Sequence, residues 1–225
     1  MSSPNPNWKP GQTVKSPVSE MVTLDADKLS PPELYKLIIG AVVPRPIAFV
    51  STCNSQGQVN LAPFSFFTGV SSNPPCLVFS VAVRPNGAGK DTLRNVQETG
   101  QFVVNSANEW LAEPLVHTAA DFPYGVNEME QAGLTPIASV KVRPPRVKES
   151  AVQFECEVYK TMPIGDGSPG SATLVVGRIV CAHVHKAAYD NGRIILQELR
   201  PVARLGGIGY CLVGNTFELP VPKIS

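Results

Sequence analysis

The sequence has almost no surplus of charge of either sign, since 19 lysines and arginines stand against 18 aspartates and glutamates. A protein that binds nucleic acid without regard to base sequence needs a clear basic surplus, so that class is disfavoured. No run of about 18 uninterrupted apolar residues occurs, so neither a transmembrane helix nor a membrane partner is expected. The first twenty residues contain no apolar stretch and do not resemble a secretory signal.

A disulfide framework is also missing. The five cysteines are an odd number, are widely spaced and form no C-x-x-C motif. This pattern predicts free thiols, mostly in the core, and a reducing compartment, which makes the protein cytoplasmic. His183 and His185 lie two apart on a predicted strand, but the third histidine, His117, is distant. We therefore predict structural or surface histidines and no metal site.

Familiar catalytic motifs fail as well. GAGKDT (87–92) is similar to the end of a phosphate-binding P-loop, but Arg84 stands where the first glycine belongs and Asp91 where a magnesium-binding hydroxyl belongs. GGIG (206–209) is too near the C-terminus for a dinucleotide fingerprint, and no G-x-S-x-G occurs. No catalytic residue is identified from such motifs.

Proline, in contrast, is abundant, with 22 residues. This is roughly twice the usual share, and it favours many short strands over long helices. Strands are predicted at 46–52, 59–71, 76–83, 101–107, 138–142, 151–162, 172–186 and 192–196, with a hairpin loop at 165–170. Short helices are predicted at 30–40 (with Gly40 past its end), from Asp91 or Thr92 to Gly100, and within 108–122. Together these elements predict a mainly β fold, a nearly closed antiparallel barrel with short helical insertions. Residues 1–20 are predicted to be a flexible N-terminal arm, and residues 21–225 a single domain.

Two segments carry a chemical signal. The loop 84–92 combines Arg84, Lys90 and Thr92 with two glycines and a helix start, which together can cradle a phosphate. The alternative is a solvated loop capped by Asp91. The extended segment 60–75 mixes small, hydroxyl and aromatic residues with proline breaks, and could lay its main chain along the edge of a flat heterocycle. The alternative is an edge strand protected by its prolines.

The order of several motifs resembles a known family. These are PRPIAFVST (44–52), Gly57, NLAPFSFF (60–67), VSSNPP (70–75), GKDTLRN (89–95) and RLGGIGY (204–210). Together they resemble the flavin reductase-like, FMN-binding split-barrel family, in particular the branch similar to nitrilotriacetate monooxygenase component B. The resemblance covers about residues 20 to 215. It implies a six-stranded Greek-key split barrel that forms a homodimer and binds FMN near the subunit interface.

The resemblance also implies a set of cofactor-binding residues. Arg45, Ser51 and Thr52 match the first strand motif, whose hydroxyls are expected to reach the ribityl chain or the phosphate. The strand along the isoalloxazine edge is matched by Ala62, Pro63, Phe64, Ser65 and Phe66. The segment that closes on the phosphate is matched by Ser80, Arg84, Lys90, Asp91 and Thr92. Tyr210 is a further candidate from the loop that approaches the flavin.

By resemblance, the expected function is an FMN-binding oxidoreductase, a flavin reductase with NADH or NADPH as candidate hydride donor. A partner oxygenase or a small-molecule substrate would receive the electrons. One departure weighs against nicotinamide oxidation, since Ala172 stands where many flavin reductases carry a histidine. Two alternatives follow: an FMN-binding electron carrier without its own nicotinamide site, or a flavin-dependent enzyme that acts on a specialised small organic molecule.

Overall fold

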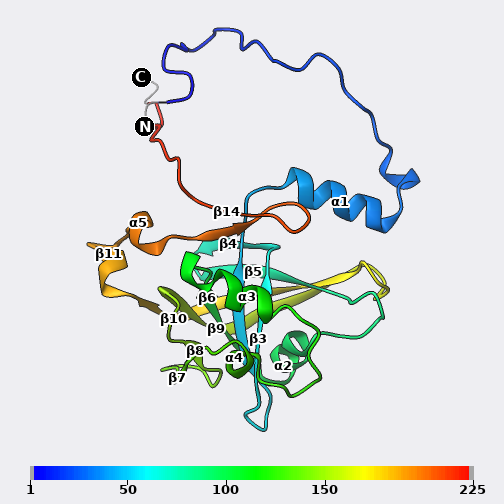
Figure 1. Cartoon of the computed structure of the whole chain (residues 1–225), viewed down its shortest axis with the longest axis vertical. Helices are drawn as coiled ribbons and strands as arrows, with labels where there is room; N and C mark the ends of the chain where they lie inside the picture. The colour runs from blue at the N-terminus through cyan, green and yellow to red at the C-terminus, as the bar shows by residue number, and fades with distance from the viewer. Residues whose placement is uncertain (1–2, 223–225) are drawn as a thin grey trace.

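A computed structural model describes residues 3–222, and its centre is a seven-stranded antiparallel sheet that curls into a barrel (Figure 1). The strand order is β3 (Val59–Phe64), β2 (Ala48–Cys53), β6 (Gln101–Ser106), β9 (Val152–Ile164), β10 (Ala172–Val184), β5 (Pro75–Ala82) and β4 (Phe67–Ser72). The β9–β10 hairpin turns at the predicted loop. The mainly β fold class is therefore confirmed, and β4 adds a strand at the sheet edge.

Smaller elements surround this sheet. A three-stranded sheet joins β1 (Arg45–Pro46), β13 (Val202–Arg204) and β14 (Tyr210–Leu212). Two short ladders pair β7 (Pro136–Ile137) with β8 (Arg146–Val147), and β11 (Tyr189–Asp190) with β12 (Arg193–Ile194). The α-helices are α1 (Pro31–Ala41), α2 (Asp91–Thr99), α3 (Ala112–His117), α4 (Glu128–Gln131) and α5 (Leu196–Leu199). The 3-10 turns are η1 (Ala26–Lys28), η2 (Glu109–Leu111) and η3 (Lys186–Ala188).

The core lies on both faces of β2, which is buried along its whole length. Ala48 and Val50 point into the barrel, where the rings of Phe64, Phe79 and Phe102 pack together. On the opposite face of β2, Phe49 packs into a second apolar cluster that includes residues of α3 and α4. Because β2 is enclosed on both sides, the end strand β3 and the helices beside it are held in fixed positions.

Helix α2 begins and ends where the sequence predicts. It begins at Asp91, and Gly100 follows its end in the left-handed conformation (φ 69°), which glycine adopts without strain. Helix α1 begins after Ser30, whose hydroxyl and N–H both bind the Glu33 carboxylate. Gly40 lies inside α1, which ends at Ala41, so the predicted end of this helix was wrong by two residues.

Several predicted elements were wrong. Residues 138–142 form no strand, because the N–H groups of Val140, Lys141 and Val142 bind the buried carboxylate of Glu155 instead. The predicted strand 59–71 breaks at residues 65–66 into β3 and β4, the helix 108–122 is reduced to η2 and α3, and the strand 192–196 to β12. The terminal segments extend away from the barrel on the side of α1 and β14 (Figure 1). The division into arm and domain stays a prediction. No helix between residues 3 and 222 is long and apolar enough to cross a membrane.

Candidate functional site

A tight loop brings Arg84 and Lys90 together at the start of α2. The loop follows β5 and turns at Gly87, which has φ 77° and donates its N–H to the Arg84 carbonyl at 2.9 Å. The Arg84 N–H donates in turn to the Ala88 carbonyl at 3.3 Å. The chain thus doubles back, and Lys90, the N-cap residue of α2, lies beside Arg84. The first N–H groups of any helix lack partners within the helix, so the α2 start adds partial positive charge here.

The two cations at this helix start are poorly neutralised. The pKa of Lys90 is lowered, first by partial burial and then by the charge of Arg84, and the smaller opposing effects of Asp121 and Asp91 do not offset this. Within residues 3–222, its ammonium makes neither an ion pair nor a hydrogen bond. Arg84 Nε is buried without a hydrogen-bond acceptor among the described residues, and its ion pair with Asp121 (3.4 Å) uses a carboxylate that is 83% exposed. Such a pair of partly dehydrated cations can accept an anion that supplies the missing negative charge.

Beneath α2, two hydrogen bonds attach the helix to the sheet. Asn95 Nδ2 donates to Thr52 Oγ1 at 3.0 Å, and Asn60 on β3 is hydrogen-bonded to Thr92 at 2.9 Å. Both threonines are almost completely buried. In this chain their hydroxyls attach α2 to the sheet. The structure brings Arg84, Lys90 and Thr92 together at the start of α2, and it places Thr52, which the sequence assigned to the first strand motif, beneath this helix.

Asp91 faces a neighbouring small polar cavity. Asn54, Asn60, Asn95 and Tyr124 also line this cavity. The guanidinium of Arg94 lies over the Tyr124 ring, 4.2 Å from its centre. Asp91 is the first residue of α2, where a carboxylate is favourable to the helix dipole.

Glu128 is a site residue that the sequence did not reveal. Its side chain is buried, and burial raises the pKa of its carboxyl group. Glu128 Oε2 accepts the N–H of Leu61 at 2.8 Å, on the end strand β3. Its other oxygen faces the amide of Asn60 at 3.2 Å. Glu128 thus fixes the edge of β3 near α2, although it lies on α4, more than sixty residues from Leu61.

A second group of predicted residues gathers at the far end of β3. Arg45 is buried, and its guanidinium donates to the carbonyls of Ile39 (2.7 Å), Val42 (2.8 Å) and Leu205 (3.0 Å). It also lies 5.8 Å from the Phe66 ring centre, and Ser65 Oγ is 3.5 Å from Nε. Arg45 therefore joins the end of α1 to the loop before β14.

The remaining predicted residues lie around these two groups. Ser80 donates its N–H to the Phe66 carbonyl at 2.9 Å. Ser51 faces away from α2, and its hydroxyl donates to the Pro145 carbonyl at 2.5 Å. Tyr210 on β14 stacks with Arg204, 4.4 Å from ring centre to guanidinium carbon. The half-buried residues Ala62 and Pro63 and the buried Phe64 form the part of β3 between the two groups.

Comparison with known proteins supports the fold. The sequence profile of the flavin reductase-like domain matches residues 40–199. The uncharacterized protein YwrF of Bacillus subtilis is 42% identical over 206 residues, covering 90% of this chain and 100% of that protein.

Solved structures agree. The crystal structure of nitrilotriacetate monooxygenase component B from Bacillus cereus has a TM-score of 0.86 at 38% identity, covering 90% of this chain and 100% of that one. The 2-nitrobenzoate 2-nitroreductase NbaA of Pseudomonas fluorescens has a TM-score of 0.81 at 33% identity, covering 89% and 96%. The split-barrel fold expected from the sequence is confirmed.

Proposed function

The chain belongs to the flavin reductase-like family, and from this premise we propose that it is an FMN-dependent oxidoreductase that accepts hydride from NADH or NADPH. The observation that carries the choice of FMN is the pair of cations at the start of α2. Arg84 and Lys90 are partly buried and poorly neutralised. A phosphate dianion would satisfy both cations and the free N–H groups of the helix start.

The residues between the two groups fit a flat ring. Strand β3 ends the sheet, so the outer edge of its backbone between Leu61 and Pro63 is available beside α4, except for the Leu61 N–H, which binds Glu128. Phe66, which is 39% exposed, stands at the end of this edge next to Arg45. The isoalloxazine ring of FMN would supply the hydride-accepting chemistry. The chain's own contribution is to bind the phosphate, orient the ring and hold β3 in place through Glu128.

A homodimer is part of the proposal. Large apolar side chains stay exposed on α1 and the segment after it, among them Tyr35, Leu37, Ile38, Val42 and Val43. Ile208, in the loop between β13 and β14, is 95% exposed. Contiguous exposed apolar surface favours association, and a symmetric dimer is the commonest closed assembly. Light scattering at micromolar concentration tests it, and a monomer that still binds FMN tightly would contradict it.

A second candidate function rests on Ala172. This residue begins β10 and pairs with Ala82 on β5, two residues before Arg84. Its methyl group offers no hydrogen bond to a nicotinamide near the loop 84–92. NbaA, which is 33% identical, is named as a nitroreductase, and component B is named as part of a monooxygenase. The chain could accordingly serve a specialised small organic substrate, an oxygenase partner, or electron transfer without a nicotinamide site.

Two measurements decide among these functions. The purified protein is denatured, and the mass of any released chromophore is determined. The FMN-loaded protein is then mixed anaerobically with NADH or NADPH while the visible flavin absorbance is followed. Rapid bleaching supports the reductase. Bound FMN without bleaching supports the carrier or the specialised enzyme, whereas failure to bind FMN would overturn the proposal.

A further inference from the structure

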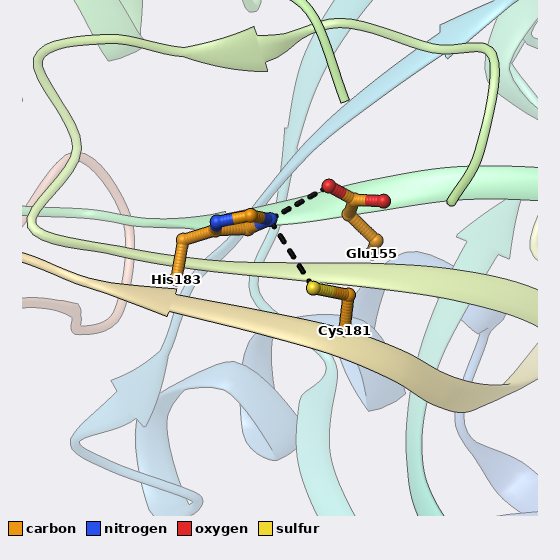
Figure 2. Close-up of side chains that lie close together, drawn as sticks. All are labelled: Glu155, Cys181 and His183. Atoms are coloured by element: carbon orange, nitrogen blue, oxygen red, sulfur yellow. Dashed lines mark hydrogen bonds and ion pairs between the residues drawn. The ribbon is translucent and has the colours of Figure 1, made fainter. Parts of the chain in front are cut away.

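A glutamate, a cysteine and a histidine converge on one face of the long β9–β10 hairpin (Figure 2). Glu155 on β9 pairs directly with Cys181 on β10, and His183 follows two residues later on the same face. A register shift between Ile179 and Cys181 marks a bulge at this point. Bulges redirect side chains, and they are common beside functional sites.

The three side chains meet at one atom. His183 Nε2 lies 2.7 Å from Glu155 Oε1 and 3.5 Å from Cys181 Sγ. Figure 2 shows the ring nitrogen pointing between the carboxylate and the thiol. A nitrogen that carries one proton cannot make two well-directed hydrogen bonds at once. If a metal cation replaced this proton, the carboxylate, the thiolate and the ring nitrogen could all bind it.

The carboxylate is held rigidly. Glu155 is fully buried, and each of its two oxygens accepts a hydrogen bond from a backbone N–H group. Val140 donates to Oε1 at 2.8 Å, while Lys141 donates to Oε2 at 2.6 Å. Metal-binding side chains are commonly oriented by hydrogen bonds from groups that do not touch the metal, and these backbone N–H groups orient the Glu155 carboxylate in that way.

We propose that Glu155, Cys181 and His183 form a zinc-binding site. Thiolate and imidazole are the ligands that zinc prefers, with carboxylate as a common third, whereas calcium and magnesium require mainly oxygen. In a tetrahedral zinc site, with Zn–S of about 2.3 Å and Zn–N of about 2.0 Å, sulfur and nitrogen lie about 3.5 Å apart. The observed separation between Cys181 Sγ and His183 Nε2 is 3.5 Å.

The remaining geometry requires only a small movement. Nitrogen and carboxylate oxygen lie about 3.3 Å apart in a tetrahedral site, so His183 must move outward by a fraction of an ångström. Its side chain is 23% exposed and Cys181 is half-buried, so the histidine can move and water can reach the fourth position. Ligation requires the Cys181 thiolate, whose proton is released to solvent, and Nε2 without its proton.

The charge of the proposed ligands matches that of zinc. Thiolate and carboxylate together carry two negative charges, which zinc would neutralise. Arg146 Nε lies 3.7 Å from Glu155 Oε1, but its guanidinium also donates to the Ala138 carbonyl and to Gln153 Oε1. It is thus held at the side of the cluster by other acceptors. Bound zinc would link the β9–β10 hairpin to the segment 138–147, since Glu155 already holds that segment.

Cobalt serves as the probe. Protein made without a polyhistidine tag is stripped with chelator and titrated with Co²⁺, which reports thiolate ligation by a charge-transfer absorption. We expect one Co²⁺ per chain, displaced by Zn²⁺, and a higher melting temperature with Zn²⁺. Cys181→Ser should abolish the charge-transfer band, and His183→Gln should weaken binding about tenfold or more. The matched controls Cys211→Ser and His185→Gln should leave both readouts unchanged.

The outcomes are distinct from those of the flavin experiments. Circular dichroism checks that each variant is folded. If Cys181→Ser does not fold, Cys181→Ala is used in its place. A band that persists in Cys181→Ser and Cys181→Ala, equal loss in Cys211→Ser, or no band in the wild type would overturn the zinc site. Zinc stabilisation of the wild type but not of His183→Gln would support it independently of the cobalt spectrum.

Discussion

Arg84 and Lys90 stand side by side at the start of α2, and partial burial together with the Arg84 charge lowers the pKa of Lys90. A charge-assisted contact of Lys90 with phosphate is worth about 1.5–3 kcal/mol. Lys90→Ala should therefore weaken FMN binding about tenfold to a hundredfold and leave riboflavin binding almost unchanged. Titration of both flavins measures this.

The matched control is Lys148→Ala, an exposed lysine on another loop, which should bind both flavins as the wild type does. Lys90→Arg should recover only part of the FMN affinity, because a guanidinium differs in shape from an ammonium group. Equal losses for FMN and riboflavin, or no loss of either, would remove Lys90 from the phosphate site.

Burial raises the pKa of Glu128 above its ordinary value of 4.5. The folded protein therefore binds this proton more tightly than the unfolded chain does. As the pH rises from 4.5 through the folded-state pKa, this group makes the free energy of unfolding fall. Glu128→Gln should remove that contribution while its amide oxygen still accepts the Leu61 N–H. Urea unfolding from pH 4 to pH 8 should give a flatter pH profile for this variant.

The control for this profile is Glu130→Gln, an exposed residue on the same helix. It should keep the wild-type pH dependence. If the free energy of unfolding of Glu128→Gln depends on pH as that of the wild type does, then the pKa of Glu128 is not raised in the folded protein.

Gly177 on β10 leaves room for the Phe102 ring. A Cβ at this position would collide with Phe102 Cζ and would lie 3.2 Å from Cys156 Cβ. Because both neighbours are fully buried, Gly177→Ala should lower the free energy of unfolding by about 1–3 kcal/mol. Gly69→Ala on β4, where a Cβ meets nothing within 4 Å, is the control in the same urea titration. Equal stability of the two variants would contradict the packing argument.

The five thiols should differ in reactivity. Cys53, Cys76 and Cys156 are buried, and burial raises the pKa of the Cys53 and Cys156 thiols. Cys181 and Cys211 are only half-buried. A thiol reagent should therefore label two cysteines in the native protein and five after unfolding. Peptide mass mapping identifies them, and early labelling of Cys156 would contradict this order.

Local sequence signals predicted local structure well. Asp91 and Gly100 bound α2 as expected, because a helix start and a glycine C-cap depend on neighbouring residues. The segment 138–142 has the composition of a strand, but its N–H groups bind Glu155, a residue whose distance along the chain hides the interaction. The grouping of Arg84 with Lys90 was found from one short motif.

Residues that only helix packing or strand pairing brings together were missed. Glu128 and Leu61 meet through the packing of α4 on β3. Glu155 meets Cys181 through the pairing of β9 with β10. The spacing of His183 and His185 suggested that these two histidines act together. In the structure, His183 instead contacts Cys181 on its own strand and Glu155 on the opposite strand. Carboxylates of this kind have no local sequence pattern.

The edge of β3 between Leu61 and Pro63 has a hydrogen-bonding polarity of its own. Residues two apart in a strand present their backbone groups to the same edge. The Leu61 N–H is already taken by Glu128, and Pro63 has no N–H, so this stretch can accept hydrogen bonds but donates none. A peptide strand placed here would leave its own carbonyl groups without donors, whereas a flat molecule that carries N–H groups would be satisfied. The edge therefore favours ligands that carry hydrogen-bond donors over ligands that carry only acceptors.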